Sequence, residues 1–404
     1  MPDGAPVAAG TIPVQGEQRN FILQPPRRVA IVHYWLIGMR GGERVVEELL
    51  KLYPDADLFT HVLDRAKLSP ELAARTVTET FVGRLPGARK HYPKYLSLMP
   101  RALEELDLSD YDLVLSSESG PSKGVLPRPD ATHLCYCNSP MRYIWDHYYG
   151  YRDSLSGPMG WAKKRYFSQL AHRLRQWDVS SAARVDRFVA NSRFVAGRIA
   201  RFYGRDAGVV NPPVDLETYH LGDAGSGVPQ SDRDYYLFVS ELVPYKRADL
   251  AVEAFRGLKF PLKVVGQGEE YKRLSKIAPP NVELLGRVDS LADLYRGARA
   301  LVFPGEEDFG IVPVEAMACG TPVIAYGRGG VRDSVLPDVT GTFFEEQSAA
   351  SLRAAVVDFD ARRQKFDPVA IAEHAGKFGA ARFRAEFADE VTAARTRQML
   401  RFAT

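Results

Sequence analysis

The stretch FPGEEDFGIVPVEAMACGTPVIAYGRGG, residues 303–330, contains the pattern that decides the fold. It begins at the end of a buried apolar strand and continues through a polar loop with three carboxylates. A helix beginning near Val312 follows, and then a second apolar run over 321–327. A short apolar strand, a loop, a helix and another apolar strand are typical of a βαβ unit with parallel strands. The segment therefore predicts an α/β domain.

The same alternation of strand and helix extends through most of the chain. Strand-like runs lie at 29–36, 56–62, 111–119, 132–137, 187–192, 235–242, 262–266, 282–286, 300–305, 321–327 and 341–344. The pattern breaks at 211–234, which is rich in proline, glycine and polar residues and resembles a linker between domains. We therefore expect an α/β fold with two Rossmann-like, doubly wound domains that face each other across a cleft, followed by C-terminal helices. The expected boundaries are a flexible leader over 1–26, an N-terminal domain over 27–211, a C-terminal domain over 212–375 and a helical extension over 376–404.

The composition excludes several classes of protein. The 404 residues include 53 basic and 50 acidic residues, so the formal net charge is only +3. A nucleic-acid-binding specialist would carry a larger basic excess, and no nucleic-acid partner is expected. No apolar run is long enough for a transmembrane helix. Cys135, Cys137 and Cys319 do not form a zinc or disulfide pattern, so we expect buried free thiols in a reducing cytoplasm.

The loop of the opening stretch predicts a binding site. The amides of Phe309, Gly310 and Ile311 precede a helix, where unpaired N–H groups and the helix dipole favour an anion such as phosphate. Glu307 and Glu315 flank these amides with seven residues between them, the second expected within the first helical turn. Carboxylates accept hydrogen bonds from sugar hydroxyls. The alternative is an acidic helix cap with a solvated carboxylate, which the strand–loop–helix context disfavours.

Several segments resemble one family. The E-x7-E pattern from Glu307 to Glu315, followed by EAMACGTPVIAYGRGG, is similar to the signature of the retaining GT-B glycosyltransferases of family 4. The same family is resembled by five other segments: VPYKRADLAVEAF (243–255), VVGQGEEYKRL (264–274), VDRFVANSRFVAGRI (185–199), VVNPPVD (209–215) and YCNSPMRYIWD (136–146). The branch it resembles contains mannosyltransferases of O-antigen (lipopolysaccharide) and exopolysaccharide assembly. The resemblance covers roughly residues 28 to 345. It implies an acceptor-binding N-terminal domain and a C-terminal domain that binds a nucleotide sugar. The implied donor is GDP-mannose, and the implied acceptor is a glycan or a polyprenyl-diphosphate-linked glycan. No metal or other cofactor is expected.

The resemblance also implies roles for individual residues in the C-terminal domain. Glu307 would bind hydroxyls of the donor sugar, and Glu315 would hold the nucleotide ribose. The amides of residues 309–311 would contact the sugar and the distal phosphate. Lys246 would neutralise the diphosphate and act with Glu307 in catalysis, and Arg247 would assist. Val288 follows a strand end at which the base could stack.

Two further expectations concern the N-terminal domain. Gly41 and Gly42 resemble the family's glycine loop, which approaches the donor phosphate and the acceptor, although a plain strand–helix turn is the alternative. Asn138 stands where this branch often has histidine, so it can hydrogen-bond to the donor but cannot carry a proton. A second departure is Glu241, which occupies the position of an arginine that commonly forms a two-cation clamp with the lysine.

Segment 83–103 contains five basic and no acidic residues, interleaved with Tyr92, Tyr95, Leu96, Leu98 and Met99. Basic and aromatic residues together suit an anionic lipid surface, so peripheral contact at the inner face of the cell membrane is expected. WAKKRYF (161–167) is a second candidate for such contact, and a solvated helix face is the alternative for both.

Other functions remain open from the residues alone. A sugar-nucleotide epimerase or a phosphorylase would share the GT-B fold, and a non-catalytic scaffold of a polysaccharide assembly complex would tolerate the two departures. A dinucleotide oxidoreductase is disfavoured, because Gly266-Gln267-Gly268 lacks the third glycine of that fingerprint. The mechanism expected for a retaining transferase is front-face substitution, since no second carboxylate presents itself as a covalent nucleophile.

Overall fold

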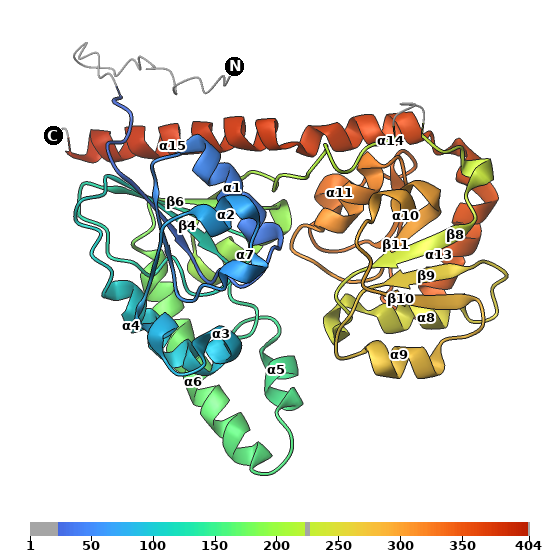
Figure 1. Cartoon of the computed structure of the whole chain (residues 1–404), viewed down its shortest axis with the longest axis horizontal. Helices are drawn as coiled ribbons and strands as arrows, with labels where there is room; N and C mark the ends of the chain where they lie inside the picture. The colour runs from blue at the N-terminus through green and yellow to red at the C-terminus, as the bar shows by residue number, and fades with distance from the viewer. Residues whose placement is uncertain (1–22, 223–226, 403–404) are drawn as a thin grey trace. The chain divides into compact units, whose positions relative to one another are not determined.

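The computed structural model describes residues 23–222 and 227–402, and these form two compact units (Figure 1). Unit 1 contains the described residues up to Asn191, with Val195–Val210 and the chain from Phe383 onward. Unit 2 contains Ser192–Phe194 and Asn211–Arg382. Most of the predicted leader, residues 1–22, lies outside the described residues.

Unit 1 is built on a seven-stranded parallel sheet with the order β3-β2-β1-β4-β5-β6-β7. Its strands are β1 (Val29–His33), β2 (Asp57–Thr60), β3 (Val77–Glu79), β4 (Leu113–Glu118), β5 (Thr132–Cys137), β6 (Arg187–Ala190) and β7 (Ala207–Val209). The central strands β1, β4 and β5 are buried along their whole length. Burial over the whole length follows from this position, because helices cover both faces of a parallel sheet. β4 nevertheless ends in three buried polar residues, Ser116, Ser117 and Glu118.

The helices of unit 1 are α1 (Gly41–Leu52), α2 (Pro70–Ala74), α3 (Ala88–His91), α4 (Met99–Glu104), α5 (Tyr148–Ser154), α6 (Gly160–Ala182), and most of α7 (Arg193–Tyr203) and of α15 (Ala380–Phe402). α5 and the beginning of α6 extend away from the sheet as a helical hairpin (Figure 1). The C-terminal helix α15 belongs to the core of this unit. Phe383 and Phe387 pack edge-on against Tyr136 of β5, and Glu390 forms an ion pair with Arg187 at 2.7 Å.

Unit 2 is built on a six-stranded parallel sheet with the order β10-β9-β8-β11-β12-β13. Its strands are β8 (Tyr235–Val239), β9 (Leu262–Val265), β10 (Val282–Gly286), β11 (Ala298–Phe303), β12 (Val323–Tyr326) and β13 (Gly341–Phe344). Its helices are α8 (Ala248–Phe255), α9 (Tyr271–Ile277), α10 (Ala292–Gly297), α11 (Ile311–Ala318), α12 (Val331–Ser334), α13 (Ala349–Arg362) and α14 (Pro368–Ala375).

The strand order of each sheet fixes where a ligand can bind. In both units the chain builds three strands outward in one direction and then returns to the other side of the first strand. The order therefore reverses between β1 and β4 in unit 1, and between β8 and β11 in unit 2. In open α/β sheets the crevice at the carboxyl ends of such a strand pair is where ligands bind.

These observations confirm the predicted fold class: two parallel-sheet, Rossmann-like units with C-terminal helices. Cys135, Cys137 and Cys319 are buried free thiols, as expected. The segment that resembled a linker packs on unit 2 in its described part, where the side chain of Arg233 is fully buried. Its guanidinium donates to the carbonyls of Ala298 and Gly320. Within the described residues, no helix is both long and apolar enough to cross a membrane.

Candidate functional site

The candidate site of unit 2 is centred on an ion pair between Lys246 Nζ and Glu307 Oε1. Lys246 ends a short 3-10 helix (Pro244–Lys246) in the connection that follows β8, and Glu307 lies in the loop directly after β11. β8 and β11 are the neighbouring strands at which the sheet order reverses, so the two side chains meet at the binding crevice. Each side chain is less than one-fifth exposed, which leaves one edge of the pair open to a ligand.

The loop that carries Glu307 is held by close backbone contacts. The amide of Gly330 donates to the carbonyl of Glu307 at 2.8 Å. A Cβ at Gly330 would lie 1.9 Å from the Asp308 carbonyl oxygen, and one at Gly329 would lie 2.5 Å from the Glu307 carbonyl oxygen. Both glycines are therefore required sterically, because any side chain would push the loop away from α12.

The helix start after this loop leaves amides available for an anion. Gly310 is the N-cap of α11 and has φ +87, a left-handed conformation that glycine adopts without strain. Within the described part of the chain, the backbone N–H groups of Phe309, Gly310 and Ile311 donate to no other group. The Phe309 ring is buried and packs against Phe378, so only its backbone can contribute to binding.

Glu315 is the fifth residue of α11, because the helix begins at Ile311. It therefore lies just beyond the first turn in which we expected it. Its Oε2 accepts a hydrogen bond from the Tyr295 hydroxyl at 3.0 Å. Tyr295 is fully buried in α10, and burial raises the pKa of its hydroxyl well above the ordinary value. It remains a neutral donor that fixes one oxygen of Glu315, a support that nothing in the local sequence indicated.

Arg247 is the next residue after Lys246, but its side chain contacts other groups than Glu307. It has φ +57 as the N-cap of α8, and its guanidinium forms two hydrogen bonds of 3.0 Å with the Asp249 carboxylate. It also donates to Gln347 at 3.3 Å. Gln347 in turn donates to the carbonyl of Pro304, just before the Glu307 loop. Arg247 thus orders the loop as well as supplying positive charge.

Two other predicted positions of unit 2 are less engaged. Val288 lies after β10 and is half-buried against the core of the unit, where it offers an apolar surface near Gly286. Glu241 is exposed after β8. No arginine therefore stands at the position from which the family's second cation would come, as the sequence already indicated.

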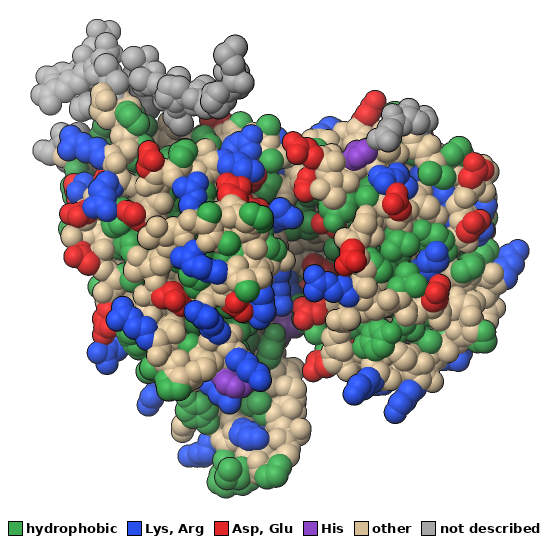
Figure 2. Space-filling view, viewed as in Figure 1, with side chains coloured by type: hydrophobic (Ala, Val, Ile, Leu, Met, Phe, Trp, Pro, Cys, Tyr) green, Lys and Arg blue, Asp and Glu red, His purple; other side chains and the backbone are tan. Residues whose placement is uncertain are grey.

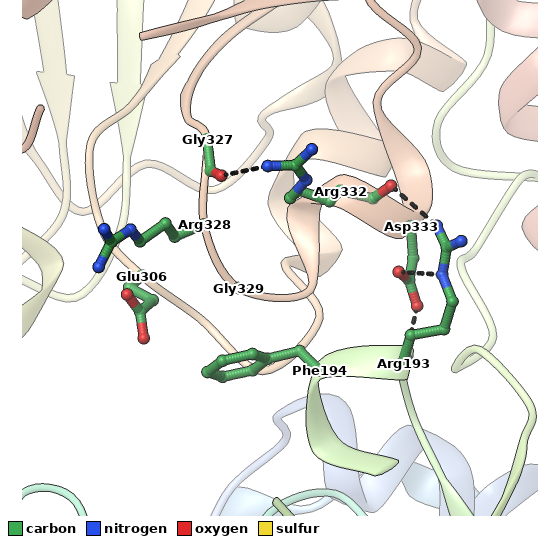
Figure 3. A pocket seen from close by; sticks show the side chains of 8 residues that line it. All are labelled: Arg193, Phe194, Glu306, Gly327, Arg328, Gly329, Arg332 and Asp333. Atoms are coloured by element: carbon green, nitrogen blue, oxygen red, sulfur yellow. Dashed lines mark hydrogen bonds and ion pairs between the residues drawn. The ribbon is translucent and has the colours of Figure 1, made fainter. Parts of the chain in front are cut away.

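A pocket of about 620 Å³ adjoins the Glu307 loop within unit 2 (Figure 3). It is lined by Arg193, Phe194, Glu306, Gly327, Arg328, Gly329, Arg332 and Asp333. Arg193 donates to the Asp333 carboxylate through its backbone amide at 2.6 Å and through Nε at 2.9 Å. Arg332 donates to the Gly327 carbonyl at 3.1 Å. Three guanidinium groups against two carboxylates give the pocket a slight positive charge.

In unit 1, Gly41 and Gly42 are the first two residues of α1, directly after the turn that follows β1. A Cβ at Gly42 would lie 2.7 Å from the Tyr34 hydroxyl and 3.2 Å from the His33 ring. The Glu43 carboxylate accepts a hydrogen bond from the backbone amide of Arg40 at 3.0 Å, and it lies 3.8 Å from His33 Nε2. A side chain at Gly42 would therefore displace Tyr34 or His33 at the end of β1, whether or not a ligand binds.

Asn138 directly follows β5 at the same edge of the sheet. Its side chain hydrogen-bonds within unit 1: Nδ2 donates to Ser117 Oγ at 3.2 Å, and the backbone N–H of Asn138 donates to the Glu118 carbonyl at 2.7 Å. The Asn138 carbonyl accepts from Asn191 at 2.9 Å. These contacts hold the loop after β5 in place.

A buried network of charged side chains, which the sequence did not reveal, contacts the loop after β5. Lys123 Nζ lies between the carboxylates of Glu118, at 2.8 Å, and Asp178, and all three side chains are inaccessible to solvent. Asp178 also accepts from Trp145 at 2.8 Å and from Tyr203 at 3.0 Å. Burial acts to lower the pKa of Lys123, but attraction to Asp178 and Glu118 raises it above its ordinary value. The network joins β4, α6 and the loop after β5.

Comparison with known proteins gives one consistent result. Residues 39–218 match the family described as Glycosyltransferase Family 4, and residues 225–364 match the family described as Glycosyl transferases group 1. The chain is 31% identical to D-inositol 3-phosphate glycosyltransferase 2 of Catenulispora acidiphila over 340 residues, which cover 68% of this chain and 78% of that protein. It is 34% identical to D-inositol 3-phosphate glycosyltransferase of Geodermatophilus obscurus over 48% of this chain and 50% of that protein. Its fold is similar to that of the Anabaena protein HepE, solved in complex with UDP-glucose, with a TM-score of 0.65, 17% identity and coverage of 91% of this chain and 99% of that one.

Proposed function

Because this chain belongs to the family 4, group 1 glycosyltransferases, we propose that it transfers a sugar from a nucleotide-diphospho-sugar to a glycan or lipid-linked glycan acceptor, with retention of configuration. The observation that carries this proposal is the Lys246–Glu307 pair beside the amides of residues 309–311. A cation, hydroxyl acceptors and unpaired N–H groups then converge where the order of the sheet reverses. A diphosphate and the hydroxyls of its sugar need this combination of groups.

In the proposed mechanism, the acceptor hydroxyl attacks the anomeric carbon from the face that the diphosphate leaves. The bond between the anomeric carbon and the phosphate oxygen breaks as the new glycosidic bond forms. The proton of the acceptor passes to the departing phosphate oxygen. Lys246 stabilises the negative charge that develops on this oxygen, and Glu307 orients the sugar through its hydroxyls. A covalent sugar on Glu307, if trapped and identified by mass spectrometry, would contradict this mechanism.

Charge stabilisation by Lys246 and Arg247 would make a divalent metal unnecessary. Transfer should therefore continue at an unchanged rate when EDTA is added to the purified enzyme. A loss of activity that Mg²⁺ or Mn²⁺ restores would refute this part of the proposal.

The donor that the sequence resemblance favours is GDP-mannose. A thermal-shift screen of GDP-mannose, UDP-glucose and UDP-N-acetylglucosamine would test the choice directly, since a ligand that binds the native state raises its unfolding temperature. We expect the largest increase with GDP-mannose. HepE was solved with UDP-glucose, so a larger increase with that donor would replace the GDP-mannose assignment while leaving the transferase proposal intact.

The relatives favour a second class of acceptor. Two of them are named for transfer to D-inositol 3-phosphate, and the pocket beside Glu306 presents Arg193, Arg328 and Arg332, which suit an acceptor phosphate. We therefore propose a phosphorylated cyclitol as the alternative to a polyprenyl-diphosphate-linked glycan. Radiolabelled donor should be offered with each acceptor in turn. Partition of the label into the organic phase identifies the lipid-linked acceptor, and label in the anionic aqueous product identifies the cyclitol.

We also propose that the enzyme works in the cytoplasm at the inner face of the cell membrane, with peripheral contact through 83–103. The support is the five basic residues of this segment and the lipid-linked acceptor that the resemblance implies. Flotation with anionic vesicles tests the contact.

A further inference from the structure

Large apolar and aromatic side chains are unusually exposed on the hairpin of α5 and α6, residues 148–168, which we call the α5–α6 tip. The exposed fractions are 76% for Trp161, 69% for Met159, 67% for Tyr149, 57% for Tyr166 and 47% for Tyr151. Burial of such groups is normally favourable, and a cluster of them on a surface indicates an interaction site. In Figure 2, hydrophobic and basic side chains lie together on this projecting part of unit 1.

The tip is held in shape by contacts below its exposed groups. The Tyr148 ring stacks on Phe167 with 5.8 Å between centroids, and its hydroxyl donates to Ser168 at 2.8 Å. The Arg175 guanidinium also lies over the Tyr148 ring, 5.0 Å from the centroid. α5 is thereby fixed to α6, and the exposed residues are displayed by an ordered hairpin.

The α5–α6 tip carries a net positive charge. Residues 148–168 carry four basic residues and one acidic residue, Asp153, which Arg152 and Lys164 pair at 3.0 and 3.5 Å. Lys163 and Arg165 form no ion pair with any described residue. Unpaired cations beside exposed tryptophan and tyrosine are the combination found where a protein meets the headgroups of an anionic bilayer.

The basic segment 83–103 contributes charge but not the apolar groups that we expected from it. Met99 is fully buried, and Tyr92, Tyr95 and Leu96 are partly buried against the core around Val82. The basic members Arg84, Arg89, Lys90, Lys94 and Arg101 are exposed. Of the five apolar and aromatic residues named for this segment in the sequence, Leu98 is the exposed one, at 37%.

The two segments lie at the same end of unit 1. Leu96 of 83–103 packs against the cluster formed by Met141, Ile144, Ala171 and Leu174, the last two from α6. Together the two segments carry nine basic residues and one acidic residue, whereas the whole chain has a net charge of only +3. The rest of the chain is therefore net negative, and the positive charge is concentrated at this end.

We propose that the α5–α6 tip is the membrane-inserting element of this protein, and that 83–103 supplies accompanying electrostatic attraction. Met159, Trp161 and Tyr149 enter the interfacial layer of an anionic bilayer, while Lys163 and Arg165 contact lipid phosphates. This assignment deepens the proposed membrane contact and changes which residues carry it. It rests on exposure, charge and packing within unit 1 and does not require that the enzyme use any particular donor.

The test is flotation of the full-length protein with vesicles of phosphatidylcholine alone or mixed with phosphatidylglycerol. We expect binding to the mixed vesicles and its loss at high salt. Trp161→Ala combined with Met159→Ala should reduce the partition coefficient at least about tenfold, since two large side chains no longer leave water. Lys163→Glu with Arg165→Glu should reduce it by a similar or larger factor. The matched control, Lys272→Glu with Lys276→Glu on exposed positions of α9, should leave binding unchanged.

A second measurement needs no substitution. Phospholipids brominated near the headgroup should quench part of the tryptophan fluorescence of the native protein, because Trp35, Trp145 and Trp177 are partly buried whereas Trp161 is exposed.

The proposal is overturned if the native protein does not bind mixed vesicles, or if binding occurs without quenching and survives both tip variants. Concentration-dependent self-association that Trp161→Ala abolishes, without vesicle binding, would instead make the tip a contact between copies of the chain. Transfer to a short water-soluble acceptor should be equal for the native protein and the tip variants, so a failure here is distinct from a failure of the proposed transferase function.

Discussion

Lys246 and Glu307 form an ion pair although they lie 61 positions apart in the chain. The cause is the strand order of unit 2, in which β8 and β11 are neighbours and one of the two residues lies in the connection that follows each strand. The pair brings the cation proposed for the diphosphate to the carboxylate proposed for the donor sugar. It also means that each residue orients the other before any ligand binds.

A double-mutant cycle on this pair should show strong coupling. Lys246→Ala and Glu307→Gln should each reduce kcat by a factor of roughly 10² to 10³, a range typical for removal of one preorganised electrostatic group. The double variant should lose much less than the product of the two factors, because each single change already disorders the partner. Steady-state kinetics with the identified donor would check this. Fully multiplicative losses would show that the two side chains act independently.

Replacement of Glu241 by arginine should improve donor binding. Glu241 is exposed at the position that commonly provides the family's second cation, so Glu241→Arg replaces a repulsive charge by an attractive one. For exposed groups such a change is worth up to about 1 kcal/mol, which corresponds to a decrease of roughly fivefold in donor KM. Glu241→Gln is the matched control and should give a smaller decrease. An unchanged or increased KM for Glu241→Arg would show that this position does not face the diphosphate.

Gly310→Ala should damage both stability and donor binding. The φ of +87 is unfavourable for any residue with a Cβ, at a cost of about 1–2 kcal/mol, and relief of the strain would turn the amides of residues 309–311. The control is Gly197→Ala within α7, where a Cβ meets no atom within 4 Å and alanine should stabilise the helix by about 0.5–1 kcal/mol. Urea denaturation and donor-induced thermal shifts would measure the two effects. Equal stability of the two variants would contradict the assigned backbone conformation.

Lys123→Met should strongly destabilise unit 1. The substitution leaves the Glu118 and Asp178 carboxylates together in a site without solvent, and loss of one partner of a buried charge network costs about 3–5 kcal/mol. Addition of Glu118→Gln to Lys123→Met should recover part of the loss, because it removes one of the two like charges. Urea unfolding followed by tryptophan fluorescence would report both values. A loss below about 1 kcal/mol for Lys123→Met would indicate that the network is open to water.

The stability of unit 1 should decrease between pH 6.5 and pH 4 because of His133. Burial lowers the pKa of His133 from 6.5 to about 4, although its ring bonds to Ser116 at 2.9 Å. Between these two pKa values the unfolded chain therefore binds a proton that the folded chain does not. The contribution of neutral His133 to the free energy of unfolding is fully present above pH 6.5 and is lost as the pH falls toward 4. A shift of this size corresponds to at most about 3 kcal/mol.

Urea denaturation at several pH values would test this prediction by comparing the native protein with His133→Gln. The variant should be less stable at pH 7 and should show a shallower decrease on acidification. The same change at the exposed His172 of α6 serves as the control. If His133→Gln and the native protein lose stability in parallel between pH 6.5 and 4, another group accounts for the pH dependence.

The sequence by itself determined the type of fold and the composition of the candidate site. Buried parallel strands are largely apolar, so runs such as 29–36 and 235–242 were recognisable without a structure, and each was followed by a helix. The site residues of unit 2 lie in loops directly after strands, where their motif spacing is a local property of the chain. For this reason Lys246, Glu307 and the amides of residues 309–311 could be named from the sequence.

Only the tertiary structure decided which of these groups touch one another and which side chains are available. The hydrogen bond from Tyr295 to Glu315 and the buried position of Lys123 between Glu118 and Asp178 join segments whose proximity depends on sheet order and helix packing. Residue type also does not report exposure. Tyr92 and Trp161 are both aromatic residues close to basic ones in the sequence. Tyr92 nevertheless packs against the core, whereas Trp161 is exposed to solvent. Exposure and contact are properties of the packed chain, and one-dimensional spacing does not contain them.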